Sequence, residues 1–326
     1  MAGLKAPFPW YGGKSRSAHL IWSMPGDPKV YAEPFAGSLA VLLKRPPTAH
    51  RRPREMVVDI DHHIVNFWRA VKADPEAVAH HCDHPTFHAD LTARHTWLRE
   101  WGDLHRRRVM DDPEYFDARA AGWWVWGISL WIGGGWCQVT HDRRPMVQAT
   151  GGGRGVTAMG QMPHIHGNPT GGAGVRSWER RDALVGHMTE LAERPRDVIV
   201  LGGNWRQCLG PTPLMHTPTS PRPSVGILLD PPYLTGDRSD DIYGSDLDGT
   251  SDRVAIEVWE WALEHGDTYR IAYCCHDGDF DAPDGWLKRT DTFSGVRDRK
   301  GNARRDRVLF SPACADASMP LFAGAA

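Results

Sequence analysis

The chain has 326 residues, of which 41% are hydrophobic and 24% charged, which is ordinary for a globular protein. The formal net charge of -2 argues against a nonspecific polycation, although a local basic patch can still bind nucleic acid. The sequence has no apolar run of transmembrane length and no signal-peptide core at its start, so we expect a cytoplasmic protein without a membrane partner.

The first quarter of the chain alternates predicted strands and helices. Residues 29–35 are predicted to be a strand, followed by a helix over residues 39–43 that Pro46 ends. A second apolar strand at residues 56–58 leads to Asp59. An amphipathic helix then follows, with apolar positions at Ile64, Val65, Phe67, Trp68 and Val71.

The middle of the chain has a different composition. Residues 86–121 are predicted to be helical and basic, and residues 123–136 are rich in tryptophan. Residues 140–176 are rich in glycine, proline, histidine and arginine without periodicity, which predicts a loop inserted into the fold.

Regular patterns resume in the last part of the chain. Helices are expected at residues 177–193 and 250–264. Strands are expected at residues 198–201, 225–229, 269–273, 286–294 and 305–310. Strands that alternate with helices predict a mainly parallel, doubly wound α/β sheet.

The tetrad Asp230-Pro231-Pro232-Tyr233 is placed where the strand at residues 225–229 ends, and ligands bind at such strand ends in open α/β sheets. The prolines fix φ and lack N–H groups, so nearby carbonyl oxygens stay available as acceptors. The tyrosine offers a flat face to a planar ring. On these residues alone, a clamp for an amino group on a heterocycle and a plain proline turn remain open alternatives.

Two further motifs lie nearer the start of the chain. Glu33-Pro34-Phe35-Ala36-Gly37 forms a small-residue turn between a predicted strand and helix, where backbone can approach a ligand closely. Asp59, at the end of the next strand, has the position of an acid that binds ribose hydroxyls, so the pair favours a nucleoside-type cofactor. Trp10-Tyr11-Gly12-Gly13-Lys14 could hold a carboxylate or phosphate, or be a surface turn.

These motifs, in this order, resemble those of the Dam-like (D12 class) DNA adenine-N6 methyltransferases, with phage-borne members most similar. The resemblance implies a class I S-adenosylmethionine-dependent fold, Rossmann-like, with a mostly parallel seven-stranded sheet. It implies a catalytic domain formed by residues 1–85 and 181–326. Residues 86–180 would be an inserted, mainly helical and loop-containing target-recognition region.

The same resemblance assigns roles to single residues. Asp230 and the Pro231 carbonyl would accept hydrogen bonds from the adenine N6 amino group, next to Pro232, and Tyr233 would stack on the extruded base. S-adenosylmethionine would be bound by Trp10, Gly13, Lys14, Glu33, Pro34, Phe35, Gly37, Asp59, Asn204 and Asp230. Lys14 would lie near the cofactor carboxylate and Asp59 at the ribose.

The implied reaction transfers a methyl group to N6 of adenine in double-stranded DNA after base flipping. Two acceptors on the amino hydrogens localise the nitrogen lone pair, so positioning matters more than strong base catalysis. We expect no metal and a monomer without an obligate protein partner, in a bacterial cell and possibly phage- or prophage-encoded. A nuclease partner in a restriction-modification pair stays open, although the sequence shows no nuclease motif.

Several candidate DNA contacts come from residue type. Arg143, Arg144 and Arg154 lie in the predicted loop, and arginine can read guanine edges. Arg304 and Arg305 belong to a second basic cluster that would touch phosphates or form a solvated hairpin. The tryptophans of residues 123–136 could stack on bases, but aromatic residues at helical spacing are usually core, and we favour that interpretation.

Departures and rivals limit the assignment. Leu39 stands where many relatives have a second glycine, and Asn204 where they usually have an aspartate that faces the cofactor adenine. Cytosine N4, RNA adenine or a protein glutamine are alternative substrates, and a non-catalytic DNA-binding relative is another alternative. A metal site at Cys274-Cys275-His276 is disfavoured because adjacent cysteines on a strand point to opposite faces.

Overall fold

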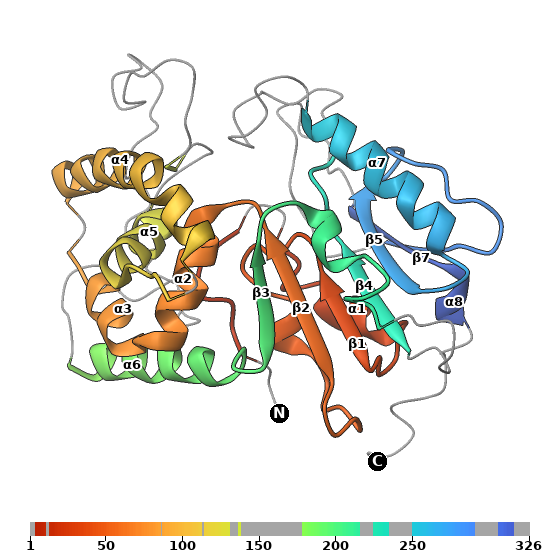
Figure 1. Cartoon of the computed structure of the whole chain (residues 1–326), viewed down its shortest axis with the longest axis horizontal. Coiled ribbons are helices and arrows are strands. Elements are labelled where there is room, and N and C mark those ends of the chain that lie inside the picture. Colours follow the sequence, from red (N-terminus) through yellow and green to blue (C-terminus); the bar gives the residue numbers. More distant parts are fainter. Residues whose placement is uncertain are drawn as a thin grey trace.

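The computed structural model describes most of the two regions that flank the middle of the chain (Figure 1). Its described residues are 4–10, 13–85, 87–112, 114–130, 136–137, 178–215, 224–234, 250–290 and 306–315. The predicted DNA contacts Arg143, Arg144, Arg154, Arg304 and Arg305 lie outside these ranges, as do Tyr11 and Gly12. Among the described residues, no helix is both long and apolar enough to cross a membrane.

A seven-stranded mixed sheet forms the centre of the described structure, in the order β3-β2-β1-β4-β5-β7-β6. The strands are β1 (Val30–Glu33), β2 (Arg54–Asp59), β3 (Val198–Gly202), β4 (Val225–Leu229), β5 (Arg270–His276), β6 (Leu287–Thr290) and β7 (Asp306–Phe310). Neighbouring strands are parallel except at β7, which is antiparallel to both β5 and β6. This mostly parallel sheet confirms the α/β class I methyltransferase fold predicted from the sequence.

The central strands of the sheet lie in the protein core. Every residue of β1 and of β4 is buried, as expected for parallel strands that are covered on both faces. Cys274 belongs to the core on one face of β5 and Cys275 to the core on the other, which confirms that the two thiols point apart.

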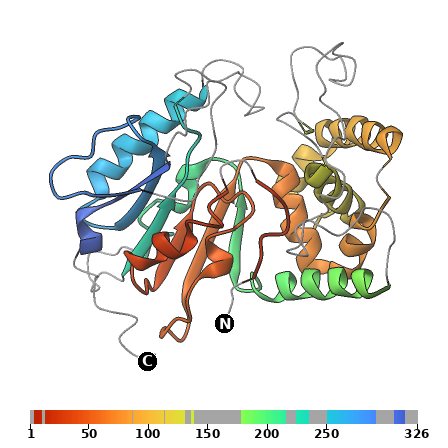
Figure 2. The ribbon, with the colours of Figure 1, turned by 180° about the vertical axis from the view of Figure 1, so that it is seen from behind.

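Helices cover the sheet and extend beyond its β3 edge (Figures 1 and 2). They are α1 (Ala18–Ser23), α2 (His62–Ala73), α3 (Pro75–Cys82), α4 (His88–Asp111), α5 (Ala118–Leu130), α6 (Trp178–Glu193), α7 (Thr250–His265) and α8 (Pro312–Ala315), with 3-10 turns η1 (Leu42–Lys44) and η3 (Trp205–Cys208). The predicted helices that correspond to α2, α6 and α7 are confirmed.

Two helix predictions were wrong in extent. The helix expected over residues 39–43 is only the short turn η1, because Leu39 has a φ of 55° and cannot be part of a right-handed helix. The helical stretch expected over residues 86–121 is divided into α4 and α5. The sequence has a proline at position 113, which cannot continue a helix, and the Asp117 side chain accepts a hydrogen bond from Ala120 N at the start of α5.

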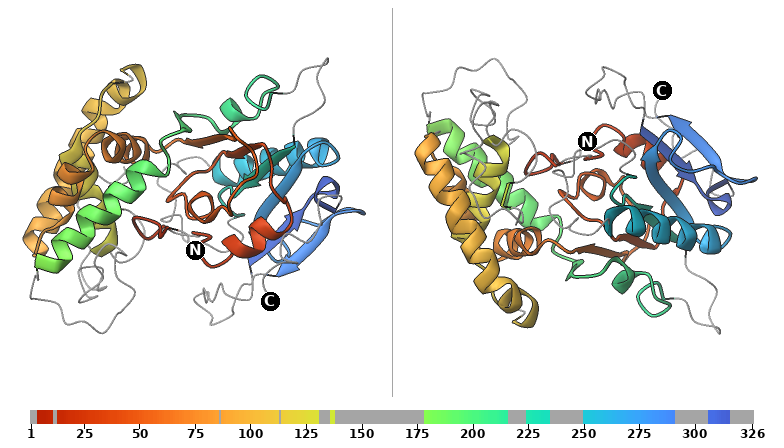
Figure 3. Two further views of the ribbon diagram at one scale, coloured as in Figure 1. Left: turned by 90° about the horizontal axis from the view of Figure 1, so that it is seen from below. Right: turned by 90° about the horizontal axis from the view of Figure 1, so that it is seen from above.

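Helices α3, α4, α5 and α6 gather around α2 in a helical cluster beside the sheet (Figure 3). Trp124 and Trp126 of α5 are buried there, so the interpretation of the tryptophan-rich segment as core is confirmed for them. Phe8 links the cluster to the N-terminal segment, because its ring contacts Trp124 at 4.8 Å and Phe67 at 5.3 Å between centroids. The large aromatic surfaces that meet here stabilise the position of the cluster relative to the sheet.

Candidate active site

The predicted motifs meet at the carboxyl edge of the sheet. The turn of residues 33–37 follows β1, Asp59 ends β2, and Asp230 follows β4, and these three strands are adjacent in the sheet. The chain leaves β1 toward β2 on one side and reaches β4 on the other, so the strand order reverses between β1 and β4. Open α/β sheets bind ligands at such a reversal, outside the carboxyl ends of the strands.

Lys14 and Asp230 form a buried ion pair at this reversal. Lys14 Nζ lies 2.9 Å from Asp230 Oδ1, and the lysine side chain is only 4% exposed. Burial lowers the pKa of Lys14, but the charge and hydrogen bond of Asp230, together with Cys274 and Asp306, outweigh that effect, so the net shift is upward and the ammonium stays charged. Burial raises the pKa of Asp230, and Lys14 opposes the shift.

The Tyr233 ring is packed against these charges. It is 6% exposed, Lys14 Nζ lies 4.9 Å from its centroid, and the His276 ring meets it edge-on at 4.5 Å. A cation over an aromatic face is attracted by the negative face of the ring. The structure therefore places Tyr233 beside the tetrad acid with much of its ring covered by protein.

His276 and Asp306 are neighbours of the tetrad that the sequence interpretation missed. His276 Nδ1 lies 3.1 Å from Asp306 Oδ1, and His276 ends β5, the strand next to β4. The rule that ligands bind at the carboxyl ends of strands was available from the sequence and would have identified His276 as well as Asp230. Asp306 could not be found in this way, because β7 runs antiparallel to its neighbours.

The turn after β1 is shaped by a buried acid and a glycine. Glu33 is 2% exposed, and its Oε1 accepts a hydrogen bond from the Tyr31 hydroxyl at 2.7 Å. Burial raises the pKa of Glu33 to about 8, although the Tyr31 bond favours the ionised form. Gly37 has a φ of 48°, and a Cβ at this position would lie 2.7 Å from the Trp10 indole, so Trp10 lies directly on the turn.

Gly13 keeps the turn after Trp10 tight. Gly13 N donates a hydrogen bond to Trp10 O at 2.9 Å, and a Cβ on Gly13 would lie 2.9 Å from the same oxygen. The glycine therefore allows Lys14 to follow Trp10 closely and to reach Asp230.

Asp59 is tied to the turn after β1 by hydrogen bonds. Its Oδ2 accepts from Gly37 N at 2.8 Å, and its Oδ1 accepts from Asp61 N at 2.9 Å. Burial is the main cause that raises the pKa of Asp59 to about 7, and the nearby charge of Asp61 adds to it. A carboxylate has about four lone-pair positions, so these two bonds leave capacity for hydroxyl donors.

Leu39 and Asn204, the two residues that depart from the family pattern, are both described by the structure. Leu39 is fully buried although its φ of 55° is a conformation that favours glycine. Asn204 is exposed, and its Oδ1 accepts from Arg206 N at 2.9 Å at the start of η3. Nearby, the Phe35 ring stacks on Trp205 at 6.4 Å between centroids, which completes a partly apolar wall next to the buried Pro34.

Helix α4 extends the helical cluster to this edge of the sheet. A Cβ on Gly102 would lie 2.6 Å from the His62 ring, and a Cβ on Gly202 would lie 2.7 Å from Met110 Sδ. The C-terminal half of α4 is therefore next to the carboxyl ends of β2 and β3. Arg106 and Arg107, in this half, are exposed and make no ion pair with any residue in the described ranges.

Comparison with known proteins agrees with the motifs. Residues 10–111 match the model of the D12 class N6 adenine-specific DNA methyltransferase family. The matched segment contains Trp10, the turn after β1, Asp59 and α4, whereas the tetrad lies beyond it. No curated protein matches the chain. The match confirms the resemblance and supports DNA adenine methylation as the broad activity.

Proposed function

Because residues 10–111 match the model of the D12 class N6 adenine-specific DNA methyltransferase family, we propose that this chain methylates N6 of adenine in double-stranded DNA with S-adenosylmethionine as the methyl donor. The observation that carries the proposal is the meeting of Lys14, the turn after β1, Asp59 and Asp230 at one strand-order reversal. These groups are far apart in the sequence. The cofactor that donates the methyl group and the amino group that accepts it would both bind at this edge of the sheet.

The residues at this edge fit the cofactor. S-adenosylmethionine supplies an electrophilic methyl group on a sulfonium when it is bound. Asp59 offers acceptor capacity to ribose hydroxyls, and the backbone of the turn at Gly37 can approach a ligand because a side chain is absent there. Ile60 follows Asp59 and is 62% exposed, so it presents apolar surface where a purine ring would be expected. Phe35 and Asn204 would border the same ring.

Asp230 would act on the acceptor base. Its carboxylate and the Pro231 carbonyl would each accept a hydrogen bond from the N6 amino group. Two such bonds favour a more tetrahedral nitrogen with a localised lone pair. Lys14 occupies part of the acceptor capacity of Asp230 through Oδ1, Tyr233 shares the same carboxylate, and the amino group would take the acceptor position that remains. In this role the lysine orients the carboxylate and favours its charged form at the site.

The family resemblance also assigns Lys14 to the carboxylate of the cofactor. An ammonium has three donors, so one lysine can bind Asp230 and a second oxyanion. Within the described structure its ammonium pairs with the tetrad acid at 2.9 Å and lies 4.9 Å from the Tyr233 ring centroid. We therefore assign Lys14 chiefly to positioning Asp230, with the cofactor carboxylate as its further partner.

Tyr233 requires a movement before it can stack on an extruded base. Lys14 and His276 cover the ring in the present arrangement. A flipped adenine that enters the pocket would displace the lysine from the ring face while the ion pair with Asp230 is kept. Base flipping costs a few kcal/mol, which contacts with the extruded ring would offset.

A direct test is the methylome of a bacterial host that expresses the chain. We expect N6-methyladenine at one recurring short sequence, and none of it with the Asp230→Ala variant expressed at the same level. Methylated cytosine, or no new modification in DNA from several backgrounds, would contradict the proposal. The same experiment gives the recognised sequence.

A further inference from the structure

A basic hollow lies at the opposite edge of the sheet from the candidate active site. It has a volume of about 590 Å3 and is formed by the loop of residues 45–53, the first residues of β2 and the turn between α6 and β3. The loop is at the bottom of the view in Figure 1, at the amino end of β2. Strand β2 runs from Arg54 at this edge to Asp59, five residues further on, a distance of roughly 16 Å.

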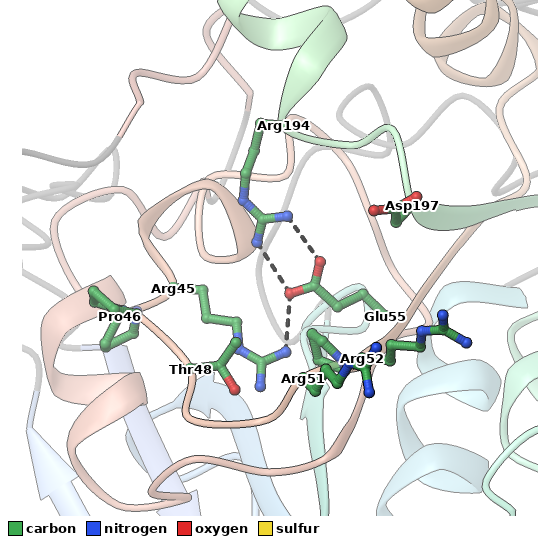
Figure 4. A pocket seen from close by; sticks show the side chains of 10 residues that line it. Arg45, Pro46, Thr48, Arg51, Arg52, Glu55, Arg194 and Asp197 are labelled. Carbon is green, nitrogen blue, oxygen red and sulfur yellow. Dashed lines mark hydrogen bonds and ion pairs between the residues drawn. The ribbon is translucent and has the colours of Figure 1, made fainter.

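The floor of the hollow is an ion-pair network (Figure 4). Arg194 binds both oxygens of Glu55, with Nη1 2.8 Å from Oε2 and Nη2 3.0 Å from Oε1. Arg45 Nη1 approaches Oε1 of the same carboxylate at 2.9 Å, and its Nη2 lies 3.1 Å from Asp27 Oδ1. Two guanidinium groups and two carboxylates thus satisfy one another and fix the base of the loop.

The rim of the hollow carries positive charge without such partners. Arg51 and Arg52 are exposed and make no ion pair or hydrogen bond through their side chains with a residue in the described part of the chain. Lys29 lies with both arginines along an adjoining hollow. Four arginines and two carboxylates line the main hollow, and with Asp27, which pairs with Arg45, the net excess there is one positive charge.

The loop holds these cations in place. Pro46, Pro47 and Pro53 fix φ at three of its positions. Asp27 fastens its middle, because Asp27 Oδ2 accepts from Ala49 N at 2.8 Å and from the Thr48 hydroxyl at 3.0 Å. A ligand that binds here would therefore pay little entropy to order the loop.

We propose that this hollow is a binding site for phosphate groups, with Arg51 and Arg52 as the principal ligands. The guanidinium fork matches the oxygens of a phosphate and can bind them in pairs. The size of the hollow is that of a site for a small molecule such as a nucleotide. The phosphate can belong to a free phosphoanion or to the backbone of a DNA segment other than the one held at the active site. The inference does not depend on methyl transfer.

The test compares two double variants of the full chain. Arg51→Ala with Arg52→Ala removes the rim. Arg108→Ala with Arg253→Ala is the matched control, because both of these arginines are exposed but paired with Asp112 and Glu257, away from the hollow. Calorimetric titration with pyrophosphate measures the phosphoanion, and binding of random-sequence duplex DNA across a salt series measures the backbone. Equal melting temperatures would show that the variants are folded.

The expected result is that the rim variant loses at least tenfold in pyrophosphate affinity, or that its DNA salt slope falls by about two, while the control keeps both values. A loss for pyrophosphate alone identifies a free phosphoanion as the ligand, and a reduced DNA slope identifies the DNA backbone. Equal behaviour of both double variants and the wild type in both titrations would overturn the proposal.

Discussion

Lys14 Nζ and Asp230 Oδ1 lie 2.9 Å apart in a buried ion pair that joins the first motif of the chain to the tetrad. A buried ion pair loses favourable hydration, and removing one partner leaves the other charge buried without compensation. The pair gives the tetrad acid one fixed donor and a defined orientation. The predictions below follow from this arrangement and from the contacts around it.

Lys14→Ala should lower kcat by about 100-fold, because Asp230 would lose the cation that orients it and favours its charged form. The KM for S-adenosylmethionine should rise much less than kcat falls. Steady-state kinetics with varied cofactor separates the two constants, and Lys14→Arg should recover part of kcat. A large rise in KM with kcat unchanged would instead assign Lys14 to the cofactor carboxylate.

The affinity for S-adenosylmethionine should rise as the pH increases through about 7 and level off above that value. Asp59 has a raised pKa of about 7, and ribose hydroxyls donate to its ionised form, so binding favours loss of its proton. Titration calorimetry between about pH 5.5 and 8.5, a range that brackets the pKa of Asp59, measures the cofactor affinity at each pH. Asp59→Asn should weaken binding and remove this dependence. A profile equally steep in the variant would show that another group titrates.

At position 39, the glycine variant should be at least as stable as the alanine variant, which reverses the usual order of stability. Leu39→Ala removes a fully buried side chain and should cost about 2–5 kcal/mol of unfolding free energy. Leu39→Gly removes the same side chain but relieves a left-handed φ of 55°, so it should be at least as stable as the alanine variant.

Leu42 is the matched control for that comparison. It is also fully buried, it belongs to η1, and it has no positive φ. There, glycine should be less stable than alanine by about 0.5–1 kcal/mol. Chemical denaturation of the four variants gives the values. The same order at both positions would mean that the φ of Leu39 carries no strain.

Arg106 and Arg107 should contribute to DNA binding, since they are exposed on the half of α4 that adjoins the candidate active site. Replacing both by alanine should weaken DNA binding and reduce the slope of log affinity against log salt by about two, with cofactor affinity unchanged. Arg108→Ala is the control. Its guanidinium lies 4.1 Å from the Tyr115 ring centroid and near Asp112, so it is engaged within the protein. An unchanged slope in the double variant would show that this face of α4 does not contact DNA.

Much of the sheet and of the site followed from the sequence because the signals were local. Apolar runs ended in Asp59 and Asp230, and a rule about strand ends was enough to place both acids on one edge. The order of the motifs along the chain then gave the family resemblance, and the match over residues 10–111 agrees with it.

What the sequence did not reveal depends on tertiary structure. The pattern of residues 39–43 is apolar like a helix, but Leu39 adopts a left-handed φ within the core, which local propensity does not encode. The pairing of Lys14 with Asp230, the covering of Tyr233 and the contact of His276 with Asp306 all join distant segments. Which residues read the DNA sequence stays a prediction for Arg143, Arg144 and Arg154.

The most direct test of the account is tritium transfer from methyl-labelled S-adenosylmethionine to unmethylated DNA, followed by separation of the nucleosides. Asp230→Asn is the informative variant, because it keeps the size of the side chain and removes the charge that pairs with Lys14. We predict label in N6-methyl-2′-deoxyadenosine for the wild type, a loss of at least 100-fold for the variant, and cofactor binding within a few fold. Label in a cytosine nucleoside, or equal label in the adenine nucleoside from both proteins, would contradict the account.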